Sequence, residues 1–174
     1  LSVSRIILVF PIILLFVYEK EELSFLIFVV ASITDYFDGY FARKFNVESS
    51  TGALLDILGD KIMVTMLLVW FTFFTSNILV LISTMIILFR EISVIILRLH
   101  LVANDNFNLN QVKSDFLGKT KTTLQFISIA FLFFIPLVSN FYASLIFLFL
   151  LFCSFISCLS LFKYFFNWYL REQI

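Results

Sequence analysis

Cysteine, histidine, glycine and proline are all scarce in this chain of 174 residues, with two, one, four and two copies. Cys153 and Cys158 lie inside one apolar run, where two small buried hydrophobic residues are a better prediction than a disulfide or a metal pair. The lone His100 receives no chemical role. A disulfide framework and a zinc site are therefore not expected, and no glycine-rich phosphate loop, repeat or linker is visible.

Apolar residues make up 61% of the chain, which indicates an integral membrane protein. A spanning helix needs about 20 apolar residues, and continuously apolar runs favour helices over the alternating strands of a membrane barrel. The predicted spans are residues 5–18, 23–45, 51–75, 77–101, 119–138 and 141–166. We expect an all-α integral membrane protein with six transmembrane helices and a single domain over residues 1–174.

The charged residues are sorted along the chain although 12 basic side chains balance 12 acidic ones. If the amino terminus is cytoplasmic, every lysine and arginine except Lys20 lies at or near the cytoplasmic face. The positive-inside rule favours this orientation. A multi-pass protein whose functional site faces the cytoplasm is the prediction, with the lipid bilayer and no nucleic acid as a partner.

Four aspartates interrupt the apolar pattern. On a helix, Asp35 and Asp38 lie about 60° apart and Asp56 and Asp60 about 40° apart, so each pair shares one face. The polar segment 44–51 would turn the chain between two antiparallel helices and bring the four acids together. Carboxylates within a membrane are costly, so they are treated as functional sites by default.

Four carboxylates in a low dielectric would repel one another or take up protons unless cations neutralised them. An all-oxygen ligand set suits Mg²⁺ or Mn²⁺, and two such ions are the expected number. The small residues Gly39, Ala42 and Gly52 lie beside these acids and Arg43, where they provide either close helix packing or room for a ligand.

Two other functions would also use intramembrane acids. A small cation transporter could use them as an ion relay, but it needs a continuous polar path, and no exit route is visible in the later spans. A purely structural membrane subunit should tolerate the loss of single aspartates.

The order of these residues resembles the signature of the CDP-alcohol phosphatidyltransferases, D-x-x-D-G-x-x-A-R, eight residues, then G-x-x-x-D-x-x-x-D. The matching residues are Asp35, Asp38, Gly39, Ala42, Arg43, Gly52, Asp56 and Asp60. The resemblance implies a six-span enzyme that cleaves the pyrophosphate of a CDP-linked donor and transfers a phosphoryl-linked group to an alcohol.

Site roles follow from the same resemblance. It implies that Asp35, Asp38 and Asp56 are metal ligands and that Asp60 is both a ligand and the general base. The residues implied to contact the cytidine and its phosphates are Gly39, Ala42, Arg43 and Gly52, with Thr34 a weaker candidate.

A group of cations bears on the acceptor. Arg90 and Arg98 share a helix face, and Lys119 and Lys121 open the fifth span. Guanidinium and ammonium groups pair with phosphate oxygens, which favours an acceptor that carries a phosphate. The alternative is that they are ordinary membrane anchors, but Arg90 lies too far inside its span for that.

The segments REISVIILR and GKTKTTLQ also resemble the bacterial phosphatidylglycerophosphate synthases within that family, and Arg5 aligns with an arginine near their start. The resemblance implies CDP-diacylglycerol as donor, sn-glycerol 3-phosphate as acceptor, CMP as product, a homodimer and the bacterial inner membrane. Inositol phosphate and serine are the alternative acceptors.

Overall fold

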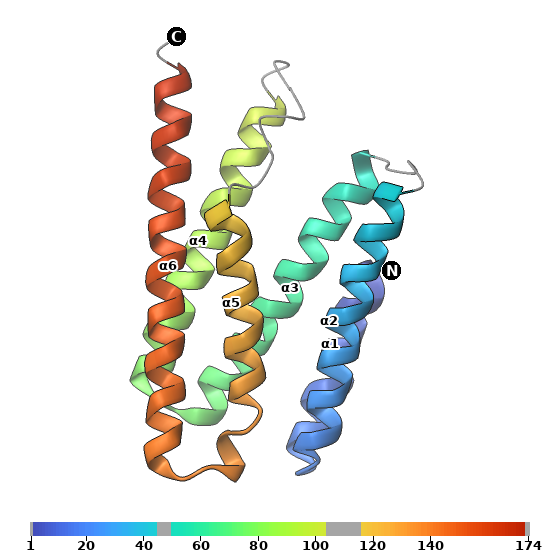
Figure 1. Cartoon of the computed structure of the whole chain (residues 1–174), viewed down its shortest axis with the longest axis vertical. Coiled ribbons are helices and arrows are strands. Elements are labelled where there is room, and N and C mark those ends of the chain that lie inside the picture. Colours follow the sequence, from blue (N-terminus) through green and yellow to red (C-terminus); the bar gives the residue numbers. More distant parts are fainter. Residues whose placement is uncertain (1, 45–49, 104–115, 173–174) are drawn as a thin grey trace. The chain divides into compact units, whose positions relative to one another are not determined.

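The computed structural model describes the backbone of residues 2–44, 50–103 and 116–172. Side chains are described for residues 6–34, 61–97, 118 and 120–166. Within the described backbone the chain is helical apart from short turns, and no strand occurs there (Figure 1). The predicted all-α class is confirmed for this part of the chain.

The described backbone forms six α-helices and one short 3₁₀ helix. They are α1 (Ser2–Val17), α2 (Glu21–Lys44), α3 (Ser50–Thr75), α4 (Ile78–Ala103), α5 (Phe116–Leu132), η2 (Ile135–Leu137) and α6 (Asn140–Glu172). Each α-helix overlaps one predicted segment, so the predicted helices are confirmed in number and order among the described residues.

Two stretches of the described helices are long and apolar enough to cross a membrane, Ile78–Leu97 in α4 and Asn140–Phe166 in α6. Shorter apolar stretches occur at Ile6–Val17 and Lys61–Thr75. Membrane crossing by all six helices therefore stays a prediction.

The fifth helix is shorter than the predicted segment 119–138, because α5 ends at Leu132. Pro136 has no N–H to donate, and in an α-helix its ring would clash with the carbonyl four residues earlier, that of Leu132. Hydrogen bonds of 3₁₀ type follow instead, with Leu137 N donating to Phe134 O at 3.0 Å. The proline thus ends the α-helix and lies at the second position of η2.

The turn between α1 and α2 is closed by Glu19, whose φ of 57° is in the left-handed region that favours glycine. Glu19 N donates to Phe16 O at 3.1 Å, and Lys20 N donates to Leu15 O at 3.0 Å. These bonds satisfy the last carbonyls of α1 in a Schellman arrangement. The chain reverses there, and α2 packs against α1.

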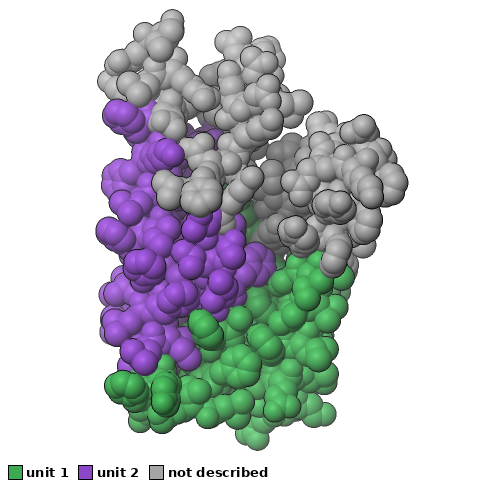
Figure 2. All heavy atoms as spheres, in the orientation of Figure 1, with its two compact units in different colours: residues 1–74, 129–143 green, residues 75–128, 144–174 purple. Residues whose placement is uncertain are grey.

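The chain divides into two compact units, which Figure 2 shows in green and purple. Unit 1 comprises residues 1–74 and 129–143, and therefore holds α1, α2 and nearly all of α3. Unit 2 comprises residues 75–128 and 144–174, and therefore holds α4 and most of α5 and α6.

The interior of unit 1 is organised around Phe133, which is 1% exposed. Its ring centroid lies 5.0 Å from that of Phe71, 5.4 Å from Phe28, 5.9 Å from Phe16 and 6.0 Å from Phe25. Tilted and edge-to-face pairs of this kind contribute about 0.5–1.5 kcal/mol each beyond the area they bury. One ring thus ties together residues from α1, α2 and α3.

The interior of unit 2 contains many polar side chains among its apolar ones. The buried polar residues described there are Ser83, Thr84, Arg90, Glu91, Lys121, Gln125, Ser128, Ser154, Ser157 and Ser160. Buried charges are tolerated only when they are paired or hydrogen-bonded. The contacts among these residues therefore form the candidate functional site of unit 2.

Candidate functional site

The predicted acidic site falls on two consecutive helices of unit 1. Asp35 and Asp38 lie in the carboxyl-terminal part of α2, and Asp56 and Asp60 lie in the amino-terminal part of α3. These two helix ends lie at the same end of unit 1 (Figure 1). The helical spacing of each pair is thus as predicted. The four side chains lie outside the described residues, so their convergence on one site stays a prediction.

The residues predicted to contact CDP lie on the same two helices. Gly39, Ala42 and Arg43 belong to α2 and Gly52 to α3, and all four positions lie outside the residues whose side chains are described. Their predicted roles stay predictions.

Thr34 is the predicted nucleotide contact whose side chain is described. It is exposed, and its hydroxyl donates within its own helix to Val30 O at 2.9 Å or Ala31 O at 3.0 Å. A hydroxyl has one hydrogen and two acceptor lone pairs. Because the hydrogen is used inside α2, Thr34 can serve a ligand as an acceptor on its exposed side.

No cluster of three or more aspartate, glutamate, histidine or cysteine side chains that could hold a metal ion occurs among the residues whose side chains are described. The four aspartates lie outside that set. They thus remain the candidate ligands that the helical spacing indicates.

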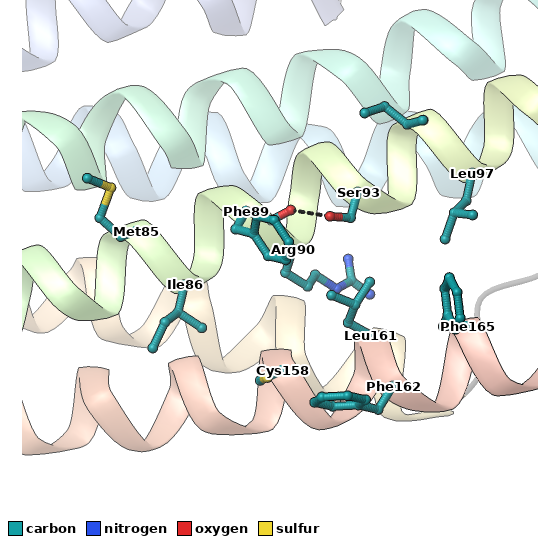
Figure 3. A pocket seen from close by; sticks show the side chains of 11 residues that line it. Met85, Ile86, Phe89, Arg90, Ser93, Leu97, Cys158, Leu161, Phe162 and Phe165 are labelled. Atoms are coloured by element: carbon teal, nitrogen blue, oxygen red, sulfur yellow. Dashed lines mark hydrogen bonds between the residues drawn. The ribbon is translucent and has the colours of Figure 1, made fainter.

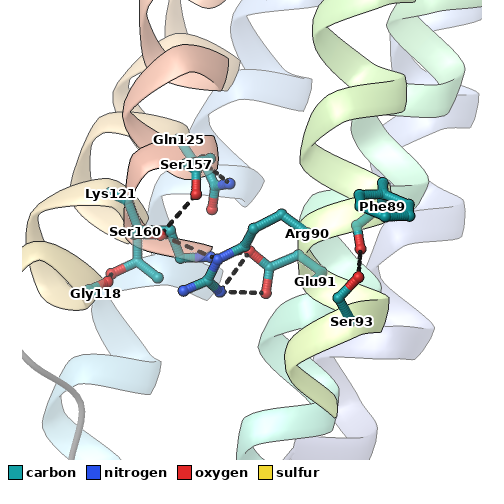
Figure 4. Close-up of polar contacts among 10 residues, drawn as sticks. Phe89, Arg90, Glu91, Ser93, Gly118, Lys121, Gln125, Ser157 and Ser160 are labelled. Carbon is teal, nitrogen blue, oxygen red and sulfur yellow. Dashed lines mark hydrogen bonds and ion pairs between the residues drawn. The ribbon is translucent and has the colours of Figure 1, made fainter. Parts of the chain in front are cut away.

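In unit 2 the structure brings together two of the five predicted acceptor-binding cations. Arg90 of α4 and Lys121 of α5 both contact the carboxylate of Glu91, and all three residues are buried, with exposures of 7%, 3% and 3% (Figure 4). The side chains of the other predicted cations, Arg5, Arg98 and Lys119, lie outside the described residues.

Arg90 is held from two helices. Its Nη1 donates to both oxygens of Glu91 at 3.2 Å, and its Nε donates to Ser160 Oγ of α6 at 3.2 Å. Neighbouring residues on a helix do not face each other, so the long arginine side chain must bend back to reach Glu91. The hydroxyl from α6 helps to fix that bent conformation.

Lys121 approaches the same carboxylate from α5. Its Nζ donates to Glu91 Oε1. One turn further along α5, Gln125 Nε2 donates to Ser157 Oγ of α6 at 3.2 Å. Ser160 Oγ in turn donates to Ser157 O at 2.7 Å. The polar contacts thus link α4, α5 and α6 within unit 2 (Figure 4).

The sequence interpretation missed the hydroxyl and amide members of this network, Gln125, Ser157 and Ser160. A signal was present in α6, where Ser154, Ser157 and Ser160 recur at intervals of three in an otherwise apolar helix. That spacing places them along one helix face. It predicts a polar stripe, although it does not say which neighbour the stripe faces.

A groove of about 720 Å³ lies between α4 and α6, next to this network (Figure 3). Its lining is apolar except near Arg90, Ser93 and Cys158. Arg90 extends from α4 toward α6 along the groove, where its guanidinium meets Ser160. The same arginine therefore belongs to both the groove wall and the polar network.

The arrangement in unit 2 is suited to binding an anion rather than to breaking a bond. It offers a guanidinium and an ammonium group, both oriented by one carboxylate, in a buried setting where electrostatic interactions are stronger than in water. Carboxylate and phosphate oxygens are the acceptors that such groups pair with. No nucleophile and base pair is present among these contacts.

Comparison with known proteins points to one family. The family model described as CDP-alcohol phosphatidyltransferase matches residues 1–160. The chain is 42% identical over 108 residues to the CDP-diacylglycerol–glycerol-3-phosphate 3-phosphatidyltransferase of Cereibacter sphaeroides, a match that covers 62% of this chain and 47% of that protein.

Two further relatives carry the same name. The Aquifex aeolicus protein is 41% identical over 97 residues, 55% of this chain and 54% of the relative. The Salmonella choleraesuis protein is 32% identical over 139 residues, 78% of this chain and 75% of the relative. The matches thus span about half the length of the Cereibacter and Aquifex proteins and three quarters of the Salmonella one.

Proposed function

The chain belongs to the CDP-alcohol phosphatidyltransferase family, and from this we propose that it transfers the phosphatidyl group of CDP-diacylglycerol to sn-glycerol 3-phosphate, forming phosphatidylglycerophosphate and CMP. The observation that carries the proposal is the family match over residues 1–160, together with the names of the relatives. The role is one in phospholipid biosynthesis.

The architecture proposed for this activity is a single catalytic domain over residues 1–174 with six transmembrane helices. The apolar stretches of α4 and α6 and the bacterial source of the relatives support a location in the bacterial inner membrane. The distribution of basic residues supports a site that faces the cytoplasm. A homodimer is part of the proposal on the strength of the family resemblance alone.

The predicted ligand set fits divalent ions that prefer oxygen. Asp35, Asp38, Asp56 and Asp60 recur at intervals of three and four on helical backbone, and no cysteine or histidine lies among them. These four would hold two Mg²⁺ or Mn²⁺ ions. When bound, the ions would neutralise negative charge on the phosphates of the donor and on the departing CMP.

The remaining steps are assigned to side chains of the chain. Asp60 accepts the proton of the acceptor hydroxyl as that oxygen bonds to the phosphorus next to diacylglycerol and the bond from this phosphorus to CMP breaks. Arg43 pairs with the donor phosphates, while Gly39, Ala42 and Gly52 leave room for the nucleotide. Thr34 offers its hydroxyl oxygen nearby.

The acceptor's own phosphate is assigned to the cationic groups. Arg90 and Lys121 are the described members, and their joint contact with Glu91 supports the assignment because it brings both cations to one place. Arg5, Arg98 and Lys119 complete the proposed set. A phosphate offers these cations more negative charge than the single carboxylate of serine does.

A parallel acceptor assay tests the proposed function. Purified full-length protein receives CDP-diacylglycerol and Mg²⁺ or Mn²⁺ with glycerol 3-phosphate, inositol phosphate or serine. CMP and a new phospholipid should appear with glycerol 3-phosphate alone, and a chelator should abolish both. Turnover with inositol phosphate or serine instead would overturn the acceptor assignment. Ion movement in proteoliposomes without CMP release would favour a transporter.

A further inference from the structure

Glu91 is a buried carboxylate in the second half of the apolar stretch Ile78–Leu97. An acid at such a position is costly and is usually retained for function. Holding helices together does not explain it well, since replacing a buried ion pair with apolar residues is often neutral or stabilising. Its contacts with Arg90 and Lys121 give a better reason for its presence.

The geometry around Glu91 gives it control over two cations. Both of its oxygens accept from Arg90 Nη1 at 3.2 Å, and Oε1 also accepts from Lys121 Nζ. Arginine and lysine side chains each carry about 2 kcal/mol of rotamer entropy. A carboxylate that fixes both of them before a ligand arrives reduces the entropy lost on binding.

We propose that Glu91 is a positioning residue that holds Arg90 and Lys121 in the arrangement that receives the phosphate of the acceptor. The inference rests on the proposed function, because it concerns the acceptor of the same reaction. Glu91 itself does not touch the acceptor, since a carboxylate would repel the phosphate. It acts through the two cations, with Ser160 as a second support for Arg90.

The variant Glu91→Gln tests the proposal because glutamine keeps the size of the side chain but loses its charge. The Michaelis constant for glycerol 3-phosphate should rise about tenfold or more, because the charge-assisted hydrogen bonds from both cations are weakened. The Michaelis constant for CDP-diacylglycerol and the turnover number should stay within about twofold of wild type. An unchanged constant for glycerol 3-phosphate would overturn the proposal. A fall in turnover alone would indicate a structural role and would also overturn it.

A matched pair of hydroxyl deletions decides the question if Glu91→Gln does not fold. Ser160→Ala removes the partner of Arg90 Nε, whereas Ser93→Ala removes a hydroxyl of α4 that donates to Phe89 O at 2.8 Å in its own helix. The Michaelis constant for glycerol 3-phosphate should rise severalfold in Ser160→Ala and stay unchanged in Ser93→Ala. Equal constants in the two variants would overturn the role of the network.

The same assays separate this inference from the proposed function. A wild-type protein that consumes no glycerol 3-phosphate would overturn both. If the wild-type protein turns over this acceptor but Glu91→Gln leaves its Michaelis constant unchanged, the role of Glu91 is overturned and the proposed function stands. Where Glu91→Gln does not fold, an unchanged Michaelis constant in Ser160→Ala has the same meaning.

Discussion

The described interiors of unit 1 and unit 2 differ in what fills them. In unit 1, aromatic rings from three helices surround Phe133, and Ser24 is the buried polar side chain described there. In unit 2, a carboxylate, a guanidinium, an ammonium group, an amide and several hydroxyls lie inside the packing of α4, α5 and α6.

The interiors of unit 1 and unit 2 meet different physical requirements. Between helices in a bilayer, packing and dispersion provide most of the association energy, because lipid tails are as apolar as the side chains themselves. The rings of unit 1 satisfy that requirement. The charged groups of unit 2 are not needed for packing, because apolar residues of the same volume would pack as well and would not carry the desolvation cost of buried charges. The difference agrees with the proposed function, in which the described core of unit 1 serves stability and the polar groups of unit 2 bind the phosphate of the acceptor.

The largest expected effect concerns catalysis and comes from Asp60, at the acidic end of unit 1. Asp60→Asn should lower the turnover number by about 10²–10⁴-fold, because the general base is lost. The thermal midpoint in detergent should change little. Glu22→Gln is the control, since Glu22 is an exposed acid at the opposite end of α2. Near-normal turnover in Asp60→Asn would remove it as the base.

The next effect concerns stability and tests the aromatic interior directly. Phe133→Ala should lower the free energy of unfolding by about 3 kcal/mol, the lower end of the range for soluble cores, because the cavity remains while the contribution of water exclusion is smaller in lipid. Reversible unfolding in mixed micelles measures it. Phe10→Ala, at a position 59% exposed, is the matched control and should cost far less. Equal losses would mean that the ring cluster does not organise unit 1.

The smallest effect concerns a neutral contact in the polar interior. The hydrogen bond from Gln125 Nε2 to Ser157 Oγ at 3.2 Å should be worth about 0.6 kcal/mol, and at most about 1.7, as found for polar pairs within membranes. A double-mutant cycle of Gln125→Leu and Ser157→Ala measures this coupling. A coupling above 3 kcal/mol would show that the network of unit 2 is chiefly a stabilising device and would break the contrast with unit 1.

The helices could be predicted because their signal is local. Long apolar runs separated by short polar segments give six helices in the right order, and the end of the third was predicted at residue 75, where α3 ends at Thr75. The end of the fifth was wrong by several residues because hydropathy does not register the missing N–H of Pro136. Pro11 has no such effect, since α1 continues through it.

The candidate site could be predicted only in part. The spacing of the aspartates is a local pattern, and the backbone places all four on helices as the pattern requires. The contact of Arg90 and Lys121 with one carboxylate could not be predicted in this way, because it depends on how α4, α5 and α6 align with one another. The spacing of the charges along one helix carries no information about that alignment.

The adjacency of Arg90 and Glu91 has a consequence for how the protein is made. A charged residue at the centre of a helix opposes membrane insertion by about 2.5–3.5 kcal/mol. Because the contact between these two side chains lies entirely within α4, opposite charges would enter the bilayer together if α4 spans it as proposed. Synthesis proceeds from the amino terminus, so α4 precedes α5 and α6. In the proposed six-span protein, the pairing therefore gives α4 a counter-ion of its own during insertion, before α5 and α6 follow it into the membrane with Lys121 and Ser160.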